Sequence, residues 1–131
     1  QIRKEAAVGA DPYDLVVTLD RVFVPGRADG TVHEFSPDLT LESVHEGFSR
    51  PVDLFRANGR WWVLDAEAAR LRSLDGDLVD TNAPSLVAAP VGGGRLVVSH
   101  YDDDRISLVD VADGTVWTAD TPAYPFGAVV V

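Results

Sequence analysis

Charged side chains are most densely packed in the segment SHYDDDR, residues 99–105. Asp102, Asp103 and Asp104 place three carboxylates side by side, and carboxylate oxygens are ligands that hard cations such as Ca²⁺ prefer. Three adjacent aspartates cannot all face one ion, however, and the spacing of an EF-hand loop is absent. We therefore expect a solvated hairpin turn and no metal site.

His100 directly precedes this turn and is the most plausible general base in the chain. If the protein is an enzyme, His100 with Asp102 is the pair that we expect to act. A lone histidine at the end of a strand is more commonly a hydrogen-bonded structural residue. His33 and His45 fall on outer strands, away from His100, and no zinc-protease, hydrolase-elbow or nucleotide-loop motif occurs. We assign no catalytic residue and no cofactor.

The composition narrows the classes of partner. The chain has 131 residues, a formal net charge of −10 and no cysteine. The negative charge argues against nucleic acid and anionic membrane surfaces as partners. The lack of cysteine excludes disulfides and thiolate metal sites. No apolar run is long enough to cross a bilayer, for which about 18 residues are needed, so direct membrane insertion is not expected.

The elements that carry these side chains repeat along the chain. Prolines at positions 12, 51, 84 and 125 are separated by 39, 33 and 41 residues. After each of the first three comes an apolar block, at 22–24, 61–63 and 96–98. Eight residues beyond each block begins a third apolar segment, at Val32, Leu71 and Ile106. A period of about 40 residues indicates a repeat architecture.

Each repeat predicts four short strands joined by tight turns. The predicted strands are 14–19, 21–26, 30–36 and 40–46, then 52–57, 60–65, 70–75 and 77–81, then 85–90, 95–100, 105–111 and 115–120. Residues 65–74 have local helix propensity, but the repeat register predicts a turn and a strand there. Gly92, Gly93 and Gly94 are expected to form a hairpin turn and no phosphate loop.

Four short antiparallel strands at this period predict the blades of an all-β β-propeller. We place the blades at about 12–50, 51–83 and 84–124, within one partial propeller domain spanning 1–131. Residues 2–8 and 125–131 are expected to belong to flanking incomplete blades. A propeller closes with about four to eight blades. The three blades are therefore expected to form an open arc that needs further blades, from the same parent chain or from another copy.

The third repeat resembles the YVTN-type (YncE-like) bacterial propeller repeat. The resemblance rests on Ile106-Ser107-Leu108-Val109-Asp110, which ends a strand in aspartate, and on Pro125-Phe126-Gly127-Ala128-Val129-Val130. The first repeat matches fairly and the second poorly. The resemblance implies a propeller fold and an exported bacterial protein placed in the periplasm, on the cell surface or outside the cell. It does not specify an activity, because similar propellers serve binding proteins and enzymes alike.

The turns between second and third strands are expected to share one rim with the loops that join the blades. Such scaffold-mounted loops are where propellers commonly bind a partner. We therefore predict a non-catalytic binding or sensing module for a protein or small-molecule ligand. The alternatives are part of a lactonase-like or lyase-like propeller enzyme, and a structural scaffold in a larger assembly. The candidate rim residues are Arg27, Asp29, Arg50, Arg70, Tyr101, Asp103, Asp104, Arg105, Tyr124 and Phe126.

Overall fold

The structure is a computed structural model that describes residues 4–81, 83–85, 87–100 and 102–122. These residues form three four-stranded antiparallel sheets, each running through its strands in sequence order. The all-β fold and the three predicted blades are confirmed. None of these residues belongs to a helix that could span a membrane.

Each sheet is one blade, with its strands called A to D from the first to the last. Blade 1 comprises β1 (Val16–Val17), β2 (Val22–Gly26), β3 (Thr31–Phe35) and β4 (Leu41–His45). Blade 2 comprises β5 (Pro51–Ala57), β6 (Arg60–Asp65), β7 (Arg70–Ser73) and β8 (Leu78–Asp80). Blade 3 comprises β9 (Val87–Gly92), β10 (Arg95–His100), β11 (Arg105–Asp110) and β12 (Val116–Asp120).

All twelve predicted strands are found, and β1, predicted at 14–19, is the most shortened. Strand β1 ends at Val17, because the next residues close a turn: the Thr18 amide donates to the Arg21 carbonyl at 2.9 Å, and the Arg21 amide donates to Thr18 Oγ1 at 3.0 Å. Of residues 2–8, which were expected to belong to a flanking incomplete blade, residues 4–8 are described and form no strand. Residues 125–131 lie outside the described part of the chain.

The helix-prone segment follows the repeat register, as predicted. Residues 66–69 turn between β6 and β7, with Ala69 in the left-handed region at φ 54°, and its amide bonds to the Ala66 carbonyl. Sheet pairing has therefore overridden local propensity. The three glycines at 92–94 have positive φ and form the β9–β10 hairpin.

The core lies between the blades. Side chains alternate along each strand between the two faces of a sheet, and we call these the N-side face, toward the previous blade, and the C-side face, toward the next. Phe23 and Val32 on the C-side face of blade 1 pack against Leu54 and Val63 of blade 2. The Phe23 and Trp61 rings lie 4.8 Å apart.

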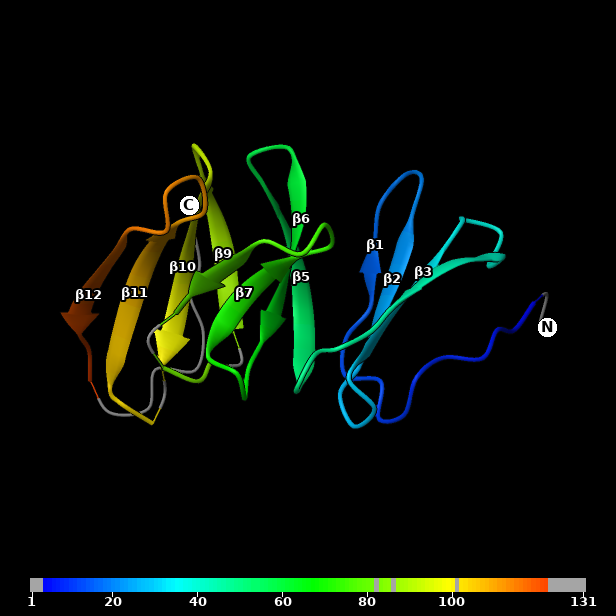
Figure 1. Ribbon diagram of the computed structural model, residues 1–131, viewed down its shortest axis with the longest axis horizontal. Coiled ribbons are helices and arrows are strands. Elements are labelled where there is room, and N and C mark those ends of the chain that lie inside the picture. The colour runs from blue at the N-terminus through cyan, green and yellow to red at the C-terminus, as the bar shows by residue number, and fades with distance from the viewer. Residues whose placement is uncertain (1–3, 82, 86, 101, 123–131) are drawn as a thin grey trace.

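A larger cluster joins blades 2 and 3. Trp62, Leu64 and Leu71 on blade 2 pack in one cluster with Leu96 and Val98 of blade 3. Trp62 is 2% exposed, and its Nε1 donates to the Ala57 carbonyl at 3.2 Å. Figure 1 shows the three sheets side by side in an open row, with blade 1 and blade 3 at its two ends.

Candidate functional site: the B–C rim

The turns between strands B and C are hydrogen-bonded to the D–A segments, which lead from each blade to the next. In blade 1 the Phe48 amide donates to the Gly30 carbonyl at 3.2 Å, in blade 2 Thr81 donates to Ala69 at 2.9 Å, and in blade 3 Thr121 donates to Asp104 at 2.8 Å. The same bond recurs in every blade. The two kinds of loop therefore share one rim, as predicted, and we call it the B–C rim.

The last residue of strand B holds the preceding D–A segment in place. In blade 2 this residue is Asp65, which is fully buried. Its carboxylate accepts the Ser49 amide at 2.9 Å and the Arg50 amide at 2.7 Å. A buried carboxylate that accepts two backbone amides has its hydrogen bonds satisfied, so the role of Asp65 is structural. We call a residue that fixes the preceding D–A segment in this way a latch.

His100 occupies the same position in blade 3. It is 2% exposed, and both of its ring nitrogens have hydroxyl partners: Ser85 Oγ lies 2.9 Å from Nδ1 and Ser107 Oγ lies 2.7 Å from Nε2. Ser107 Oγ is in turn 3.1 Å from Thr118 Oγ1. Burial lowers the pKa of His100, which favours the neutral ring. The histidine therefore ties the D–A segment before blade 3 to its strands, and its ring is closed off from solvent.

In blade 1 the corresponding residue is Gly26, which has no side chain, and Asp29 makes the equivalent hydrogen bond to the preceding segment. The Asp29 carboxylate accepts the Ala10 amide at 2.8 Å and the Thr31 hydroxyl at 2.8 Å. The bond from the Ala10 amide is the main cause that lowers the pKa of Asp29. A Cβ atom on Gly26 would lie 2.5 Å from Asp29 Oδ1, so the carboxylate occupies the space that a side chain at position 26 would fill.

Of the predicted rim arginines at positions 27, 50 and 70, the first has side-chain contacts, the second faces solvent and the third is half-buried. Arg27 Nε lies 2.8 Å from Asp11 Oδ2, and its guanidinium stacks over the Tyr13 ring at 4.4 Å. Arg70 is half-buried, and its Nε has no hydrogen-bond partner among the described residues. Arg50 is exposed, while its backbone is fixed by Asp65 and by the Ala66 amide, which donates to the Arg50 carbonyl at 3.0 Å.

The aspartate turn is solvated and holds no cluster of metal ligands. Asp102, Asp103 and Asp104 are all exposed, and Arg105 Nη2 pairs with Asp103 at 3.2 Å. Within the described residues no three histidine, aspartate or glutamate side chains gather as metal ligands. The candidates Tyr101, Tyr124 and Phe126 lie outside the described residues.

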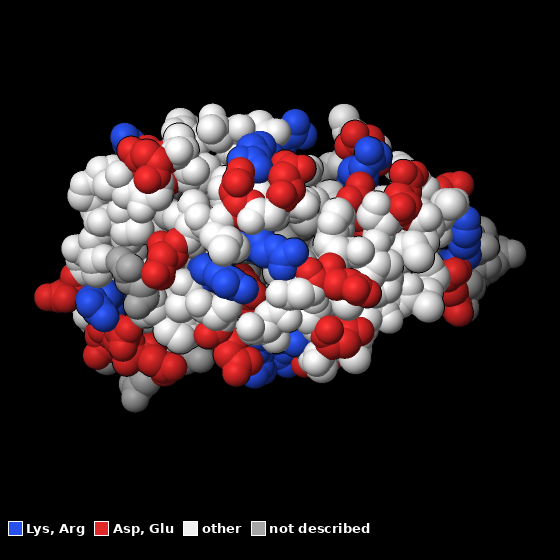
Figure 2. Space-filling view, viewed as in Figure 1, with Lys and Arg blue, Asp and Glu red and all other residues white. Residues whose placement is uncertain are grey.

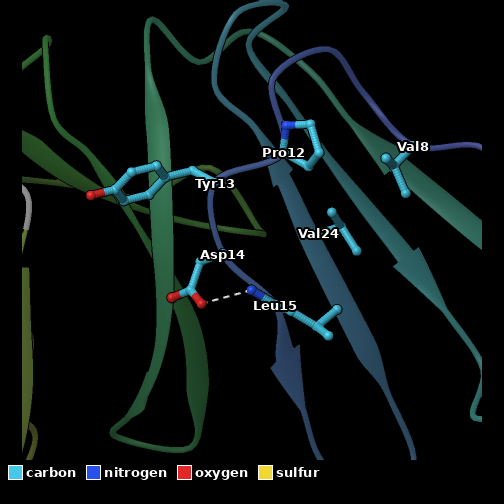
Figure 3. Close-up of a pocket in the computed structure, with 6 residues that line it drawn as sticks. All are labelled: Val8, Pro12, Tyr13, Asp14, Leu15 and Val24. Atoms are coloured by element: carbon cyan, nitrogen blue, oxygen red, sulfur yellow. Dashed lines mark hydrogen bonds between the residues drawn. The ribbon is translucent and has the colours of Figure 1, made fainter.

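A carboxylate pair at the inner strands was missed by the sequence reasoning. Asp14 and Asp53 both stand two residues after a repeat proline, and the two carboxyl groups share a hydrogen bond. Burial, reinforced by the Asp14 carboxyl, raises the pKa of Asp53 to about 7. In Figure 3 the Asp14 side chain points away from Leu15 and Val24, which border a hollow of about 490 Å³ on blade 1. The shared offset from proline was the signal that could have revealed the pair.

The opposite rim carries a polar hollow of about 360 Å³ between blades 1 and 2. Glu34 bridges Arg21 at 2.8 Å and His45 at 2.9 Å, and Arg60 pairs with Asp75 at 3.3 Å. The charges there are largely matched within the protein. Over the face drawn in Figure 2, acidic side chains are spread among scattered basic ones, with no basic patch that would suit nucleic acid.

Comparison with known proteins identifies the fold and no family. No protein-family model matches the chain. One curated relative, the major capsid protein of Pseudomonas phage phiKZ, is 25% identical over 85 residues, which are 65% of this chain and 11% of that protein. The chain thus spans about a tenth of the length of this relative.

Solved β-propeller structures are similar to the chain. Streptogramin B lyase matches with a TM-score of 0.75 and 17% identity over 91% of this chain and 44% of its own. BBS1N in complex with ARL6DN matches at 0.72 and 16%, over 97% and 46%. A chain of the mitotic checkpoint complex matches at 0.73 and 15%, over 96% and 43%. The chain spans less than half of each, and its three sheets correspond to blades of a β-propeller that are not closed into a ring.

Proposed function

We propose that the chain is part of a non-catalytic β-propeller module that binds a protein partner on the B–C rim. The observation that carries the proposal is the recurring bond between each B–C turn and its D–A segment. These bonds hold the loops rigid while Arg50, Glu67 and Asp102 remain exposed. A rigid scaffold that presents charged loop residues favours recognition, because little loop entropy is lost on binding.

The state of His100 supports binding over catalysis. A general base must reach the proton that it abstracts, directly or through one water. His100 is buried and both of its ring nitrogens already lie against serine hydroxyls. Asp102, its expected partner in an enzyme, is exposed on the turn. The histidine is thus better suited to fixing the rim than to chemistry at it.

The structural neighbours agree with a protein partner. BBS1N is solved in complex with ARL6DN, and another neighbour is a chain of the mitotic checkpoint complex. At these identities the likeness concerns the fold, and the partner of this chain is part of our proposal. A small-molecule ligand on the same rim is the second form of the binding hypothesis.

Two other functions each have one observation in their favour. A lyase-like or lactonase-like enzyme is favoured by the Asp14–Asp53 pair, because a carboxyl with a pKa of about 7 can exchange protons near neutral pH. A structural scaffold within an assembly is favoured by the 25% identity to a major capsid protein. We also propose, from the sequence resemblance alone, YVTN-type repeats and an extracytoplasmic bacterial location.

Site-specific photocrosslinking tests the rim hypothesis. A photoreactive phenylalanine analogue at position 50 or 67 lies on the B–C rim, and the same residue at position 58 lies in the β5–β6 turn on the opposite rim. We expect discrete crosslinked products in the lysate of the source organism from positions 50 and 67 and none from 58. The substitution Arg50→Glu should weaken the product formed from position 67. Products from position 58 alone would contradict the proposal.

A further inference from the structure

The N-side face of blade 1 is apolar and faces no other described sheet. Val22, Val24 and Phe35 form a small cluster on it. Val17 lies opposite Val22, Val44 opposite His33, and Leu41 opposite Phe35, so these exposed side chains belong to the same face. We call this surface, with Leu15, the blade 1 end face. Figure 3 shows Leu15, Val24 and Val8 around its hollow.

The C-side face of blade 3 is also apolar. Val97, Leu108 and Trp117 are neighbours across its strands, and Ile106 and Ala119 lie beside them. Together they line a hollow of about 170 Å³, and Trp117 is 49% exposed. We call this surface the blade 3 end face. Figure 1 places blade 1 and blade 3, which carry these two faces, at opposite ends of the row of sheets.

The chain itself shows what such faces pack against. By strand register, Leu15 corresponds to Leu54 in blade 2 and Ala88 in blade 3. Leu54 and Ala88 are 3% and 7% exposed because a preceding blade covers them, whereas Leu15 is 59% exposed. Each end face is therefore one half of a contact that the chain makes twice within itself.

The blade 3 end face likewise lacks a neighbouring blade among the described residues. Val97 stands where Phe23 and Trp62 stand in blades 1 and 2, and those rings are 1% and 2% exposed against the next blade. The smaller Val97 leaves the hollow in the blade 3 end face, which needs projecting apolar side chains from its partner. The blade 1 end face offers such side chains in Leu15, Val17 and Val44.

From this complementarity we propose that the blade 3 end face of one copy packs on the blade 1 end face of a second copy, head to tail. Two copies of the three described blades give six, within the range of about four to eight that closes a propeller, whereas three copies give nine. The assembly that we infer is therefore a dimer in which both end faces of both copies are covered. Covering them also removes apolar surface and sheet edges that promote aggregation.

Sedimentation of the 131-residue chain tests the proposal directly. We expect a reversible monomer–dimer equilibrium that shifts toward dimer as salt is raised. The reason is that each copy carries a net charge of −10, so screening reduces the repulsion between copies while the apolar contact persists. A folded monomer at every concentration and salt level would overturn the proposal. The end faces would then have to pack against blades of a different chain.

Paired variants test the head-to-tail geometry. Val17→Asp alters the blade 1 end face and Trp117→Asp the blade 3 end face, and both side chains are exposed enough for the fold to tolerate a charge. Each variant alone should be monomeric. Their mixture should form one-to-one heterodimers through one of the two contacts of the ring, because one copy keeps an intact blade 3 end face and the other an intact blade 1 end face. A two-fold symmetric contact through a single face would not be restored by mixing.

Two further variants serve as controls for the end-face substitutions. Leu78→Asp changes an apolar side chain that is 56% exposed on β8, outside both end faces, and should leave the dimer intact. If circular dichroism shows that Val17→Asp does not fold, Leu15→Asp replaces it as the variant of the blade 1 end face. Dimers that persist in all end-face variants, or a mixture that stays monomeric, would overturn the proposal.

Discussion

At the scale of single residues, each blade fixes its preceding D–A segment with a different side chain. Asp65 accepts two amides directly, His100 uses two serine hydroxyls, and Gly26 leaves room for the Asp29 carboxylate. In each case a polar side chain holds a D–A segment on its blade: Asp65 and Asp29 accept backbone amides of the segment, and His100 contacts the Ser85 hydroxyl in it. The residue types in a repeat can therefore differ while the hydrogen-bond requirement stays the same.

Asp53 makes the stability of the chain depend on pH. Its pKa rises from 3.8 to about 7 in the folded state through burial and the nearby Asp14 carboxyl, so the folded state holds the proton more tightly than the unfolded chain. The associated stability is present below about pH 4 and is lost as pH rises through 7. Asp53→Asn should remove this loss. Above pH 8 we expect the free energy of unfolding of the variant to exceed that of the wild type by about 1 kcal/mol, a value that allows for the partial exposure of Asp53 to solvent.

Urea unfolding of the wild type and the variant between pH 4 and pH 8.5 measures this effect, since these limits bracket the pKa of about 7. Asp14→Asn is the informative companion, because removing the neighbouring carboxyl should shift the stability loss to lower pH. An identical pH profile in wild type and Asp53→Asn would show that Asp53 does not hold a proton in the folded chain.

At the scale of elements, the strands were predictable and the latches were not. The eight-residue spacing between apolar blocks depends on side-chain alternation and turn length, which sequence shows directly. The latches involve Gly26, Asp65 and His100, which share no chemical type, so alignment of the repeats conceals their common position. The Asp14–Asp53 pair joins residues 39 positions apart, and only the packing of blade 1 on blade 2 brings them together.

The B–C turn of blade 1 provides a test of loop rigidity. Gly30 has φ 69°, and a Cβ atom there would lie 2.2 Å from the Phe48 carbonyl oxygen. Gly59 has φ 72° in the β5–β6 turn, with nothing within 4 Å of its Cβ position. Gly59→Ala should cost about 1 kcal/mol from left-handed backbone strain alone. Gly30→Ala should cost about 3 kcal/mol, because the D–A segment must also move.

Chemical denaturation of the two alanine variants gives the difference, with the wild type as the reference for both. Equal losses would mean that the D–A segment yields freely and that the rim is less rigid than its hydrogen bonds indicate.

At the scale of the whole molecule, the placement of the core predicts how the chain unfolds. The two larger apolar clusters lie between blades, Phe23 and Val63 in one and Trp62 and Leu96 in the other. A blade that opens alone therefore exposes the facing surface of its neighbour as well as its own. In repeat architectures, such strong coupling between neighbours makes separate repeats unfold together. We expect one cooperative transition for all three blades.

Tryptophan positions allow this to be measured blade by blade. Trp61 and Trp62 report on blade 2 and Trp117 on blade 3. Fluorescence of a Trp117→Phe variant and of a double variant, Trp61→Phe with Trp62→Phe, should give the same denaturation midpoint as far-UV circular dichroism of each variant. Because Trp117 lies on an end face, the comparison is made at one fixed protein concentration. If the Trp117 signal changed well before the dichroism, blade 3 would be an independent unit, and contact between blades would not be what holds the arc together.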